Sequence, residues 1–257
     1  ASSSMGRRRW SILFLALWIE KGHAVTGISR RLCKHHGAQI CLKRQRRVRM
    51  MGVDETILLS GHQVPASQVK VAVFGGGNFG TAMACVLGRK GVQAMLVVRK
   101  EAVAEQINTH HINPYYQSDL LLPETVTATL DAESAFRDAD FIFHAVPVQF
   151  SRSALLRVAH LMPNEVPVVS LSKGIETSTL CMMSDLLPEL LGEDRPLAFL
   201  SGPSFAAEIV QGMATAVTVA STDRDLANDL MALFTSASFR ALYTPDVVGV
   251  EVRGSRQ

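Results

Sequence analysis

The chain has 257 residues, of which 47% are hydrophobic and 19% are charged. This length allows one large domain or two small ones, and the apolar content is enough for a buried core, which excludes a wholly disordered protein. The net charge of +3 conceals an asymmetry, because residues 1–52 carry 12 Lys and Arg against the single acid Glu20, and the remainder has a net charge of −8. The basic character therefore belongs to the N-terminal segment.

The N-terminal segment has the composition of an organelle leader. It is rich in arginine, contains serine, and combines a basic cluster at residues 43–49 with an apolar run at residues 10–18. Transit peptides share this composition, although the apolar run also resembles the core of a secretory signal. Because the run is much shorter than the ~20 residues of a membrane helix, we expect no membrane span. We interpret residues 1–60 as a leader and residues 61–68 as a linker.

Two other interpretations of the basic segment stay open. It could be sequence from outside the natural protein, or a functional arm that binds nucleic acid or anionic lipid through phosphate contacts. No aromatic residues are interleaved in the cluster at residues 43–49, so we expect no nucleic-acid partner. The four cysteines and eight histidines lack metal-ligand spacing, which predicts neither a metal site nor a disulfide framework.

From residue 69 onward, apolar runs that predict strands alternate with segments that predict helices. The strands are expected at residues 69–74, 94–98, 125–130, 141–146, 167–171, 197–201 and 214–220. The helices are expected at residues 80–90, 101–108, 131–138, 150–161, 176–191, 204–211 and 223–236. This alternation predicts an α/β fold with a doubly wound, mostly parallel Rossmann-type sheet. Ligands of such sheets bind beyond the carboxyl ends of the strands.

The first predicted strand is followed by glycines at dinucleotide-binding spacing. Gly75, Gly77 and Gly80 form a G-x-G-x-x-G pattern between a strand that ends at Phe74 and a helix. Gly75 would make the turn, Gly77 would let the backbone approach a pyrophosphate, and Gly80 would let helix and strand pack closely. The anion would lie at the helix N-terminus. We therefore predict a dinucleotide site, against the alternative of a purely structural turn.

Three further segments directly follow predicted strands, namely residues 146–150, 170–176 and 201–208. Lys173 has the sharpest chemical interpretation, because an ammonium there would attract a substrate phosphate or polarise a carbonyl oxygen that gains charge as hydride arrives. The alternative is a solvated surface lysine. Gly202 and Ser204 could donate hydrogen bonds to a phosphate or to a nicotinamide amide, or could form only a turn.

Other residues near the predicted strand ends leave alternatives. Phe150 could pack on the nicotinamide or enter the core, whereas His144 lies within an apolar strand and is predicted to be a hydrogen-bonded core histidine. The second strand ends in Arg99 and Lys100, where NAD-binding folds usually have an acid on the ribose. Cations could hold a 2′-phosphate, or Arg99 could stack on the adenine. NAD and NADP therefore both stay open.

Seven motifs follow one another over about residues 69–252: GGGNFGTAMA, INTHHIN, DADFIFHAVPVQF, SLSKGIE, LSGPSFAAEI, ATAVTVAS and DVVGVEV. Together they resemble the NAD(P)-dependent glycerol-3-phosphate dehydrogenases, in particular the plant-type plastid branch. The resemblance implies reversible hydride transfer between NAD(P)H and dihydroxyacetone phosphate, which gives sn-glycerol 3-phosphate. It also implies a dinucleotide-binding domain over residues 69–252 and a homodimer. The basic leader predicts a plastid location, with the cytosol as the alternative.

The resemblance also implies roles for individual positions. Cofactor contacts are implied for Gly75, Gly76, Gly77, Asn78, Phe79, Gly80, Arg99, Phe150, Lys173 and Ala206. Substrate contacts are implied for Lys173, Gly202 and Ser204. Lys173 is the catalytic candidate among them, because it would contact both substrate and cofactor.

The chain departs from the family pattern after GVEV. Family members continue with a small residue, then Gly-Ala-Leu-Lys-Asn, whose lysine donates and accepts the proton, and then a helical domain, which we expect this chain to lack. Gln257 stands in the place of that lysine, and we expect residues 253–257 to be a non-family tail. We therefore expect a cofactor half with little or no turnover. The alternatives are a non-catalytic NAD(P)-binding regulatory protein and another dehydrogenase, such as a hydroxyacid or ketopantoate reductase.

Overall fold

The structure, a computed structural model, describes residues 55–254. The chain divides into two units, Ala1–Arg49 and Met50–Gln257, and all described residues belong to the second. The expected leader therefore lies outside the described residues up to position 54. The last three residues of the expected tail, with Gln257, also lie outside them.

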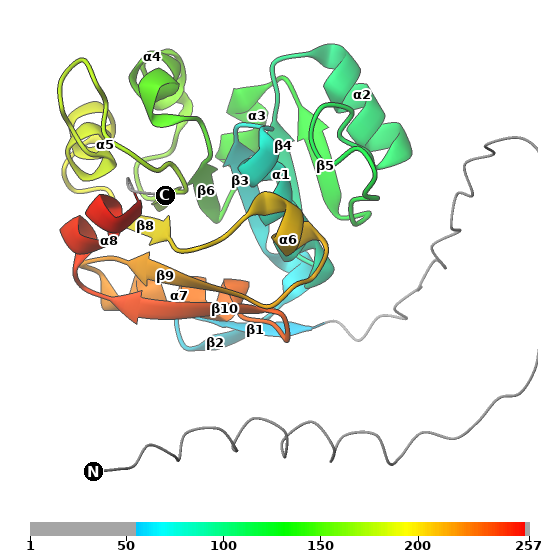
Figure 1. The fold of residues 1–257 in the computed structure, drawn as a ribbon. Helices are drawn as coiled ribbons and strands as arrows, with labels where there is room; N and C mark the ends of the chain where they lie inside the picture. The colour runs from blue at the N-terminus through cyan, green and yellow to red at the C-terminus, as the bar shows by residue number, and fades with distance from the viewer. Residues whose placement is uncertain (1–54, 255–257) are drawn as a thin grey trace, which may run out of the picture. The chain divides into compact units, whose positions relative to one another are not determined.

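The second unit is built on one mixed sheet of eight strands (Figure 1). The strands are β3 (Lys70–Phe74), β4 (Gln93–Val97), β5 (Val126–Thr129), β6 (Phe141–His144), β7 (Val168–Ser170), β8 (Leu197–Ser201), β9 (Thr215–Ala220) and β10 (Phe239–Thr244). Their order is β10-β9-β8-β7-β6-β3-β4-β5, and only the pairing of β8 with β9 is antiparallel. The order reverses at β3, which lies between β4 and β6, and this reversal is the switch point of a doubly wound fold.

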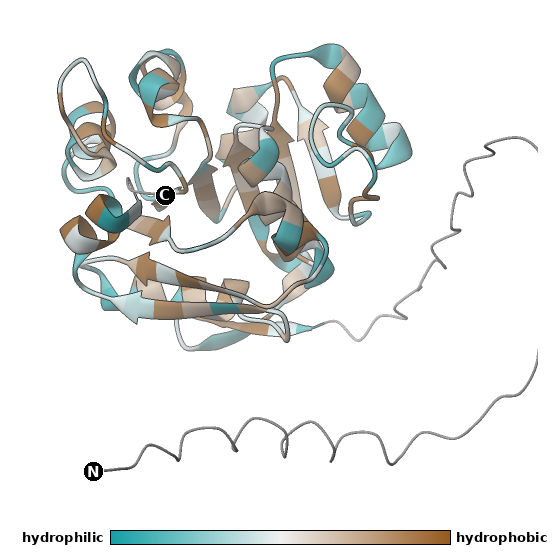
Figure 2. Ribbon diagram, in the orientation of Figure 1, coloured by the Kyte–Doolittle hydropathy of each residue, from teal (hydrophilic) through white to brown (hydrophobic). Residues whose placement is uncertain are grey.

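Helices cover both faces of this sheet. They are α1 (Asn78–Arg89), α2 (Glu101–His110), α3 (Ala132–Arg137), α4 (Val148–Val158), α5 (Met183–Leu191), α6 (Ala206–Val210), α7 (Arg224–Phe234) and α8 (Val247–Gly254). Two 3-10 turns, η1 (Ala66–Gln68) and η2 (Ala159–Leu161), complete the set in the described part of the chain. The central strands are largely hydrophobic, whereas the outer helices also carry hydrophilic residues (Figure 2).

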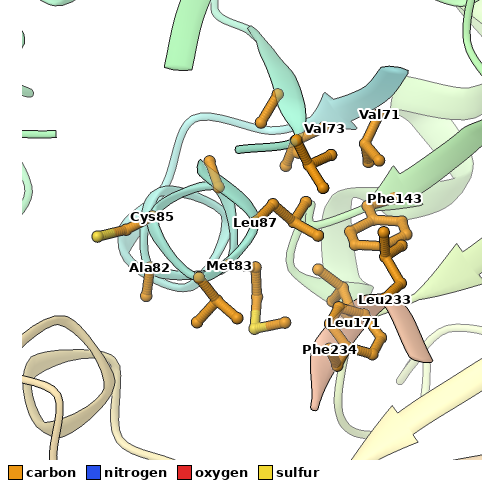
Figure 3. Packing of buried hydrophobic residues seen from close by; sticks show 14 of the residues in the cluster. Val71, Val73, Ala82, Met83, Cys85, Leu87, Phe143, Leu171, Leu233 and Phe234 are labelled. Carbon is orange, nitrogen blue, oxygen red and sulfur yellow. The ribbon is translucent and has the colours of Figure 1, made fainter. Parts of the chain in front are cut away.

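Alternation along the strands divides the core into two clusters. Val71 and Val73 of β3 face the cluster that α1, α2, α6 and α7 supply, whereas Ala72 faces the cluster of α3, α4, α5 and α8. Figure 3 shows Met83 and Leu87 extending from α1 toward the strands. This period of two with burial on both sides is typical of strands in doubly covered sheets. The α/β prediction is confirmed.

The seven predicted strands are all present, with ends within two residues of the expected positions. One helix boundary is wrong: α5 begins at Met183, and the segment from residue 176 to 182 is a loop. Its polar side chains bond locally, since the Thr179 hydroxyl donates to the Glu176 carboxylate and accepts the Cys181 N–H at 3.3 Å. Such side-chain bonds compete with helix formation. The strand β10 and the helix α8 were not predicted.

The linker expected over residues 61–68 is also wrong. The strands β1 (Thr56–Leu59) and β2 (His62–Pro65) form an antiparallel hairpin, whose turn residues Ser60 and Gly61 both have positive φ. Positive φ at both positions matches the right-handed twist of a two-residue hairpin. Ile57 is buried in the core, and the Ser60 N–H donates to Asp229 of α7 at 2.6 Å. The hairpin is therefore part of the folded unit.

Candidate active site

The strands β3, β6, β7 and β8 are parallel, so their carboxyl ends meet at one edge of the sheet. The glycine loop follows β3, and the three segments singled out in the sequence follow β6, β7 and β8. This edge is where ligands of doubly wound sheets bind. The structure therefore brings the predicted site segments to one side of the molecule.

The three glycines of the G-x-G-x-x-G pattern have different surroundings. Gly75 has a φ of +121°, and a Cβ there would lie 2.8 Å from the Ala145 carbonyl oxygen. A Cβ at Gly80 would lie only 2.1 Å from the Gly75 carbonyl oxygen, whereas a Cβ at Gly77 would meet no atom within 4 Å. The fold itself thus requires glycine at positions 75 and 80. Position 77 opens into free space at the start of α1, where no side chain caps the helix.

A buried asparagine outside the predicted cofactor and substrate contacts fixes this loop. Asn113 is 1% exposed, and its Nδ2 donates to the Gly76 carbonyl at 3.2 Å and to the Thr81 hydroxyl at 2.8 Å. Its Oδ1 accepts the N–H groups of Tyr115 and Tyr116. Asn113 is the last residue of the INTHHIN motif. Membership of that motif is the only feature of the sequence that points to this residue. Its four bonds join the glycine loop to the segment after α2.

Lys173 lies half-buried between the loop after β8 and α1. Its Nζ donates to the Gly202 carbonyl at 2.8 Å and lies 5.7 Å from the centre of the Phe79 ring. The Ser204 hydroxyl donates to the same carbonyl at 3.2 Å. Burial lowers the pKa of the Lys173 ammonium below its usual value. Lysine, glycine and serine of the predicted substrate site are thus brought together, next to an aromatic residue of the glycine loop.

The surroundings of Gly202 explain why this position has no side chain. Its φ is +153°, and a Cβ there would lie 2.9 Å from the Ala216 carbonyl oxygen of β9. The loop after β8 therefore packs its backbone directly on the neighbouring strand. The carbonyl of Gly202 remains available to accept from Lys173, as described above.

The remaining predicted contacts lie on the rim. Phe150 is 63% exposed on α4, so it does not enter the core, whereas Ala206 is buried at the start of α6. Arg99 is exposed after β4. Beside it, the Lys100 ammonium lies 4.4 Å from the centre of the Tyr115 ring, which joins this rim to the segment that Asn113 holds.

The helix α8 reaches the same edge from the C-terminal side. Gly254 is so close to β8 that a Cβ there would lie 2.6 Å from the Ser201 hydroxyl. Both carboxylate oxygens of Glu251 accept the Ser184 N–H at 3.3 Å, at the start of α5. Burial raises the pKa of the Glu251 carboxyl, and the bonds from Ser184 oppose that rise. Glu251, Gly254, Ser201 and Lys173 line one small cavity.

His144 is the core histidine that we predicted. It is fully buried at the end of β6, and its Nε2 pairs with the Ser151 hydroxyl at 2.8 Å. Burial lowers its pKa from 6.5 to about 3. The imidazole therefore stays neutral at physiological pH and serves the packing of β6 against α4 rather than proton transfer.

This histidine predicts acid sensitivity. Because the native pKa lies below the unfolded one, the unfolded chain binds an extra proton as pH falls from about 6.5 to 3, and stability is lost in that window. The free energy of unfolding should fall by up to about 1.4 kcal/mol per pH unit more than in His144→Gln. Urea unfolding at several pH values measures how the free energy of unfolding changes with pH in the parent chain and in His144→Gln. The same pH dependence in both proteins would contradict the prediction.

Metal and membrane features are absent from the part of the chain that the structure describes. Residues 55–254 contain no cluster of three or more His, Cys, Asp or Glu side chains suited to a metal ion. Within the same range, no helix has the length and apolar character that a bilayer crossing requires.

Comparison with known proteins identifies the fold and the family. A family model described as NAD-dependent glycerol-3-phosphate dehydrogenase N-terminus matches residues 70–227. The chain belongs to the NAD-dependent glycerol-3-phosphate dehydrogenase family. The chloroplastic glycerol-3-phosphate dehydrogenase (NAD+) 2 of Arabidopsis thaliana is 46% identical over 189 residues, which are 72% of this chain and 45% of that protein.

Bacterial members of the glycerol-3-phosphate dehydrogenase family match over the same part of the chain. The NAD(P)+ enzyme of Nitratidesulfovibrio vulgaris strain DP4 is 44% identical over 73% of this chain and 57% of its own length. The crystal structure of glycerol-3-phosphate dehydrogenase from Coxiella burnetii has a TM-score of 0.69 at 27% identity, covering 73% of this chain and 57% of that one. The chain spans about half the length of the relatives that it matches.

Proposed function

We propose that the chain is the cofactor-binding half of a glycerol-3-phosphate dehydrogenase and binds NAD or NADP at the glycine loop. One observation carries the proposal: position 77 is open to solvent space beside a helix start that no side chain caps. The N–H groups of such a helix start bind anions, and a residue without a side chain lets a pyrophosphate reach them. The family match supports the same assignment.

We assign the cofactor and substrate contacts as follows. The pyrophosphate would lie on residues 75–80, the adenosine near Arg99, and the nicotinamide near Phe150 and Ala206. Dihydroxyacetone phosphate or sn-glycerol 3-phosphate would lie on Lys173, Gly202 and Ser204. The proximity of Lys173 to both Phe79 and Gly202 supports this arrangement. Its ammonium group lies next to the glycine loop, which would hold the cofactor, and next to the loop after β8, which would hold the substrate.

The proposed chemistry is hydride transfer, which the bound nicotinamide supplies. Lys173 would attract the phosphate or stabilise the oxygen that gains charge, since a partly buried ammonium acts more strongly there than in water. Its lowered pKa follows from the same burial. Glutamine at position 257 has no titratable proton for general acid catalysis, a step usually worth about a hundred- to ten-thousandfold in rate. We therefore propose weak turnover or none for this chain.

We also propose a plastid location and a homodimer. The leader would comprise the residues before the β1 hairpin, whose composition suits a transit peptide. The relative from Arabidopsis thaliana is a chloroplastic protein, which supports the plastid location. The homodimer rests on the family resemblance alone.

Calorimetric titration of the chain with NADH and with NADPH tests the proposal. We expect saturable binding of at least one of them, and a preference for NADPH if Arg99 holds a 2′-phosphate. The same protein with dihydroxyacetone phosphate and the bound cofactor is then assayed for loss of NAD(P)H absorbance. Binding with little or no turnover is the result that the proposal expects. Robust turnover would contradict the proposed weak activity, and no binding of either nucleotide would contradict the proposed cofactor site.

A further inference from the structure

Two residues of α4 hold the loop that carries Lys173. Gln149 is the second residue of the helix, and its Nε2 donates to the Ile175 carbonyl at 2.8 Å. Its Oε1 accepts the Thr177 N–H at 3.1 Å and the Thr177 hydroxyl at 2.9 Å. One amide side chain thus fixes the backbone on both sides of position 176.

Arg152 holds the residue between those two contacts. Its Nε donates to the two carboxylate oxygens of Glu176 at 3.2 and 3.0 Å, and its Nη2 donates to Glu189 of α5 at 3.0 Å. Glu176 is only 4% exposed. The hydrogen bond from Thr179 and then those from Arg152 hold the pKa of its carboxyl below the usual range. These charge-assisted hydrogen bonds fix the position of the Glu176 carboxylate relative to Arg152.

Gln149 and Arg152 are three positions apart on α4, so they share one face of the helix. Lys173 lies two to four residues before the backbone that they fix. On the other side of Lys173, the Ser172 hydroxyl donates to the Val146 carbonyl, which follows β6. The lysine is thus held from both directions by the segment that begins directly after β6.

We propose that Gln149, Arg152 and Glu176 are positioning residues that hold Lys173 against Gly202 for its role in the site. This inference rests on the proposed function of Lys173. It assigns a role to the two motifs VPVQF and SKGIE together, because the glutamine of one binds the backbone of the other. A displacement of about 1 Å at a reacting group can lower the rate about a hundredfold. Loss of these positioning residues should therefore affect function.

The test measures the Lys173 amine itself. The full chain and its variants are labelled with an amine-selective acylating reagent over a range of pH, and the extent at Lys173 is read by peptide mass spectrometry. Gln149→Met removes the three bonds to the loop at an exposed position, so the fold should persist, which circular dichroism checks. We expect the midpoint of labelling to shift upward toward the ordinary lysine value, because the freed ammonium gains water.

Two carboxylates on the same arginine provide a matched comparison. Glu176→Gln and Glu189→Gln each remove one charged partner of Arg152, but only Glu176 belongs to the Lys173 loop. We expect the upward shift in Glu176→Gln and an unchanged midpoint in Glu189→Gln. Glu251, which lines the same cavity as Lys173, is unaltered in every variant.

An unchanged midpoint in Gln149→Met would overturn the inference, and so would an equal shift in Glu189→Gln. If Glu176→Gln does not fold, Gln149→Met decides alone. The labelling needs neither cofactor nor substrate. Its result therefore does not depend on whether the chain binds NADH or NADPH in the calorimetric titration. A chain that shows the shift but binds neither NADH nor NADPH would contradict the proposed function and leave the positioning of Lys173 established.

Discussion

Gly77→Val is expected to abolish NAD(P)H binding while the chain stays folded. A Cβ at position 77 meets no protein atom within 4 Å, and the φ of −78° suits any residue. The branched side chain would instead occupy the place proposed for the pyrophosphate, at the N–H groups of α1. Loss of two charge-assisted hydrogen bonds, each about 1.5–3 kcal/mol, corresponds to a loss of about a hundredfold or more in affinity. Calorimetry with NADH and NADPH measures it.

Thermal unfolding of the same variant provides the control. We expect a midpoint close to that of the parent chain, since the new Cβ has no atom within 4 Å. A variant that binds as tightly as the parent would show that the pyrophosphate does not pass position 77. A variant that unfolds would show that the loop is more crowded than the structure indicates.

The sequence predicts the part of the candidate site that local chemistry determines. Gly75, Gly77 and Gly80 could be found because a turn, a close approach and a helix contact each need glycine at fixed spacing. Lys173 could be found because a polar residue directly after a buried strand lies at the ligand edge of a parallel sheet. In each case, the strand that carries the residue is apolar and short enough to recognise without any tertiary information.

The rest of the site depends on contacts between distant positions. Asn113 bonds to Gly76 and Thr81, which precede it by 37 and 32 residues, so no local pattern predicts its role. Gln149 likewise finds its partners 26 and 28 residues further along the chain. These side chains lie on a helix or a loop where polar residues are ordinary. Only the folded arrangement distinguishes them from solvent-exposed neighbours.

The β1–β2 hairpin and the strand β10 are absent from the sequence prediction, although the sequence contains a signal for each. Ser60 and Gly61 separate two short runs with apolar residues, which is a hairpin pattern. In β10, Phe239 and Ala241 are buried while Arg240 is exposed, which is the alternation of an ordinary strand. The antiparallel pairing of β8 with β9 is different, because both strands are short and apolar and nothing in their composition determines direction.

Gly80→Ala is expected to destabilise the folded chain by about 3 kcal/mol or more. The new Cβ would lie 2.1 Å from the Gly75 carbonyl oxygen and 3.1 Å from the Ala145 Cβ. The Gly75 carbonyl oxygen cannot move aside without disturbing the turn after β3. In that turn, Gly75 already packs against the backbone of Ala145. Overpacking of a rigid interior costs about 1–3 kcal/mol and more where backbone must shift. Urea unfolding should therefore show a lower midpoint at unchanged slope.

Gly77→Ser is the matched control for this effect, because it adds a side chain three residues earlier in the same loop. Its Cβ has free space, and serine is a favourable residue at the first position before a helix. We expect a stability equal to or slightly above that of the parent chain. Equal stability of Gly80→Ala and Gly77→Ser would mean that α1 can move away from β3, and that the close contact between them does not determine the shape of the loop.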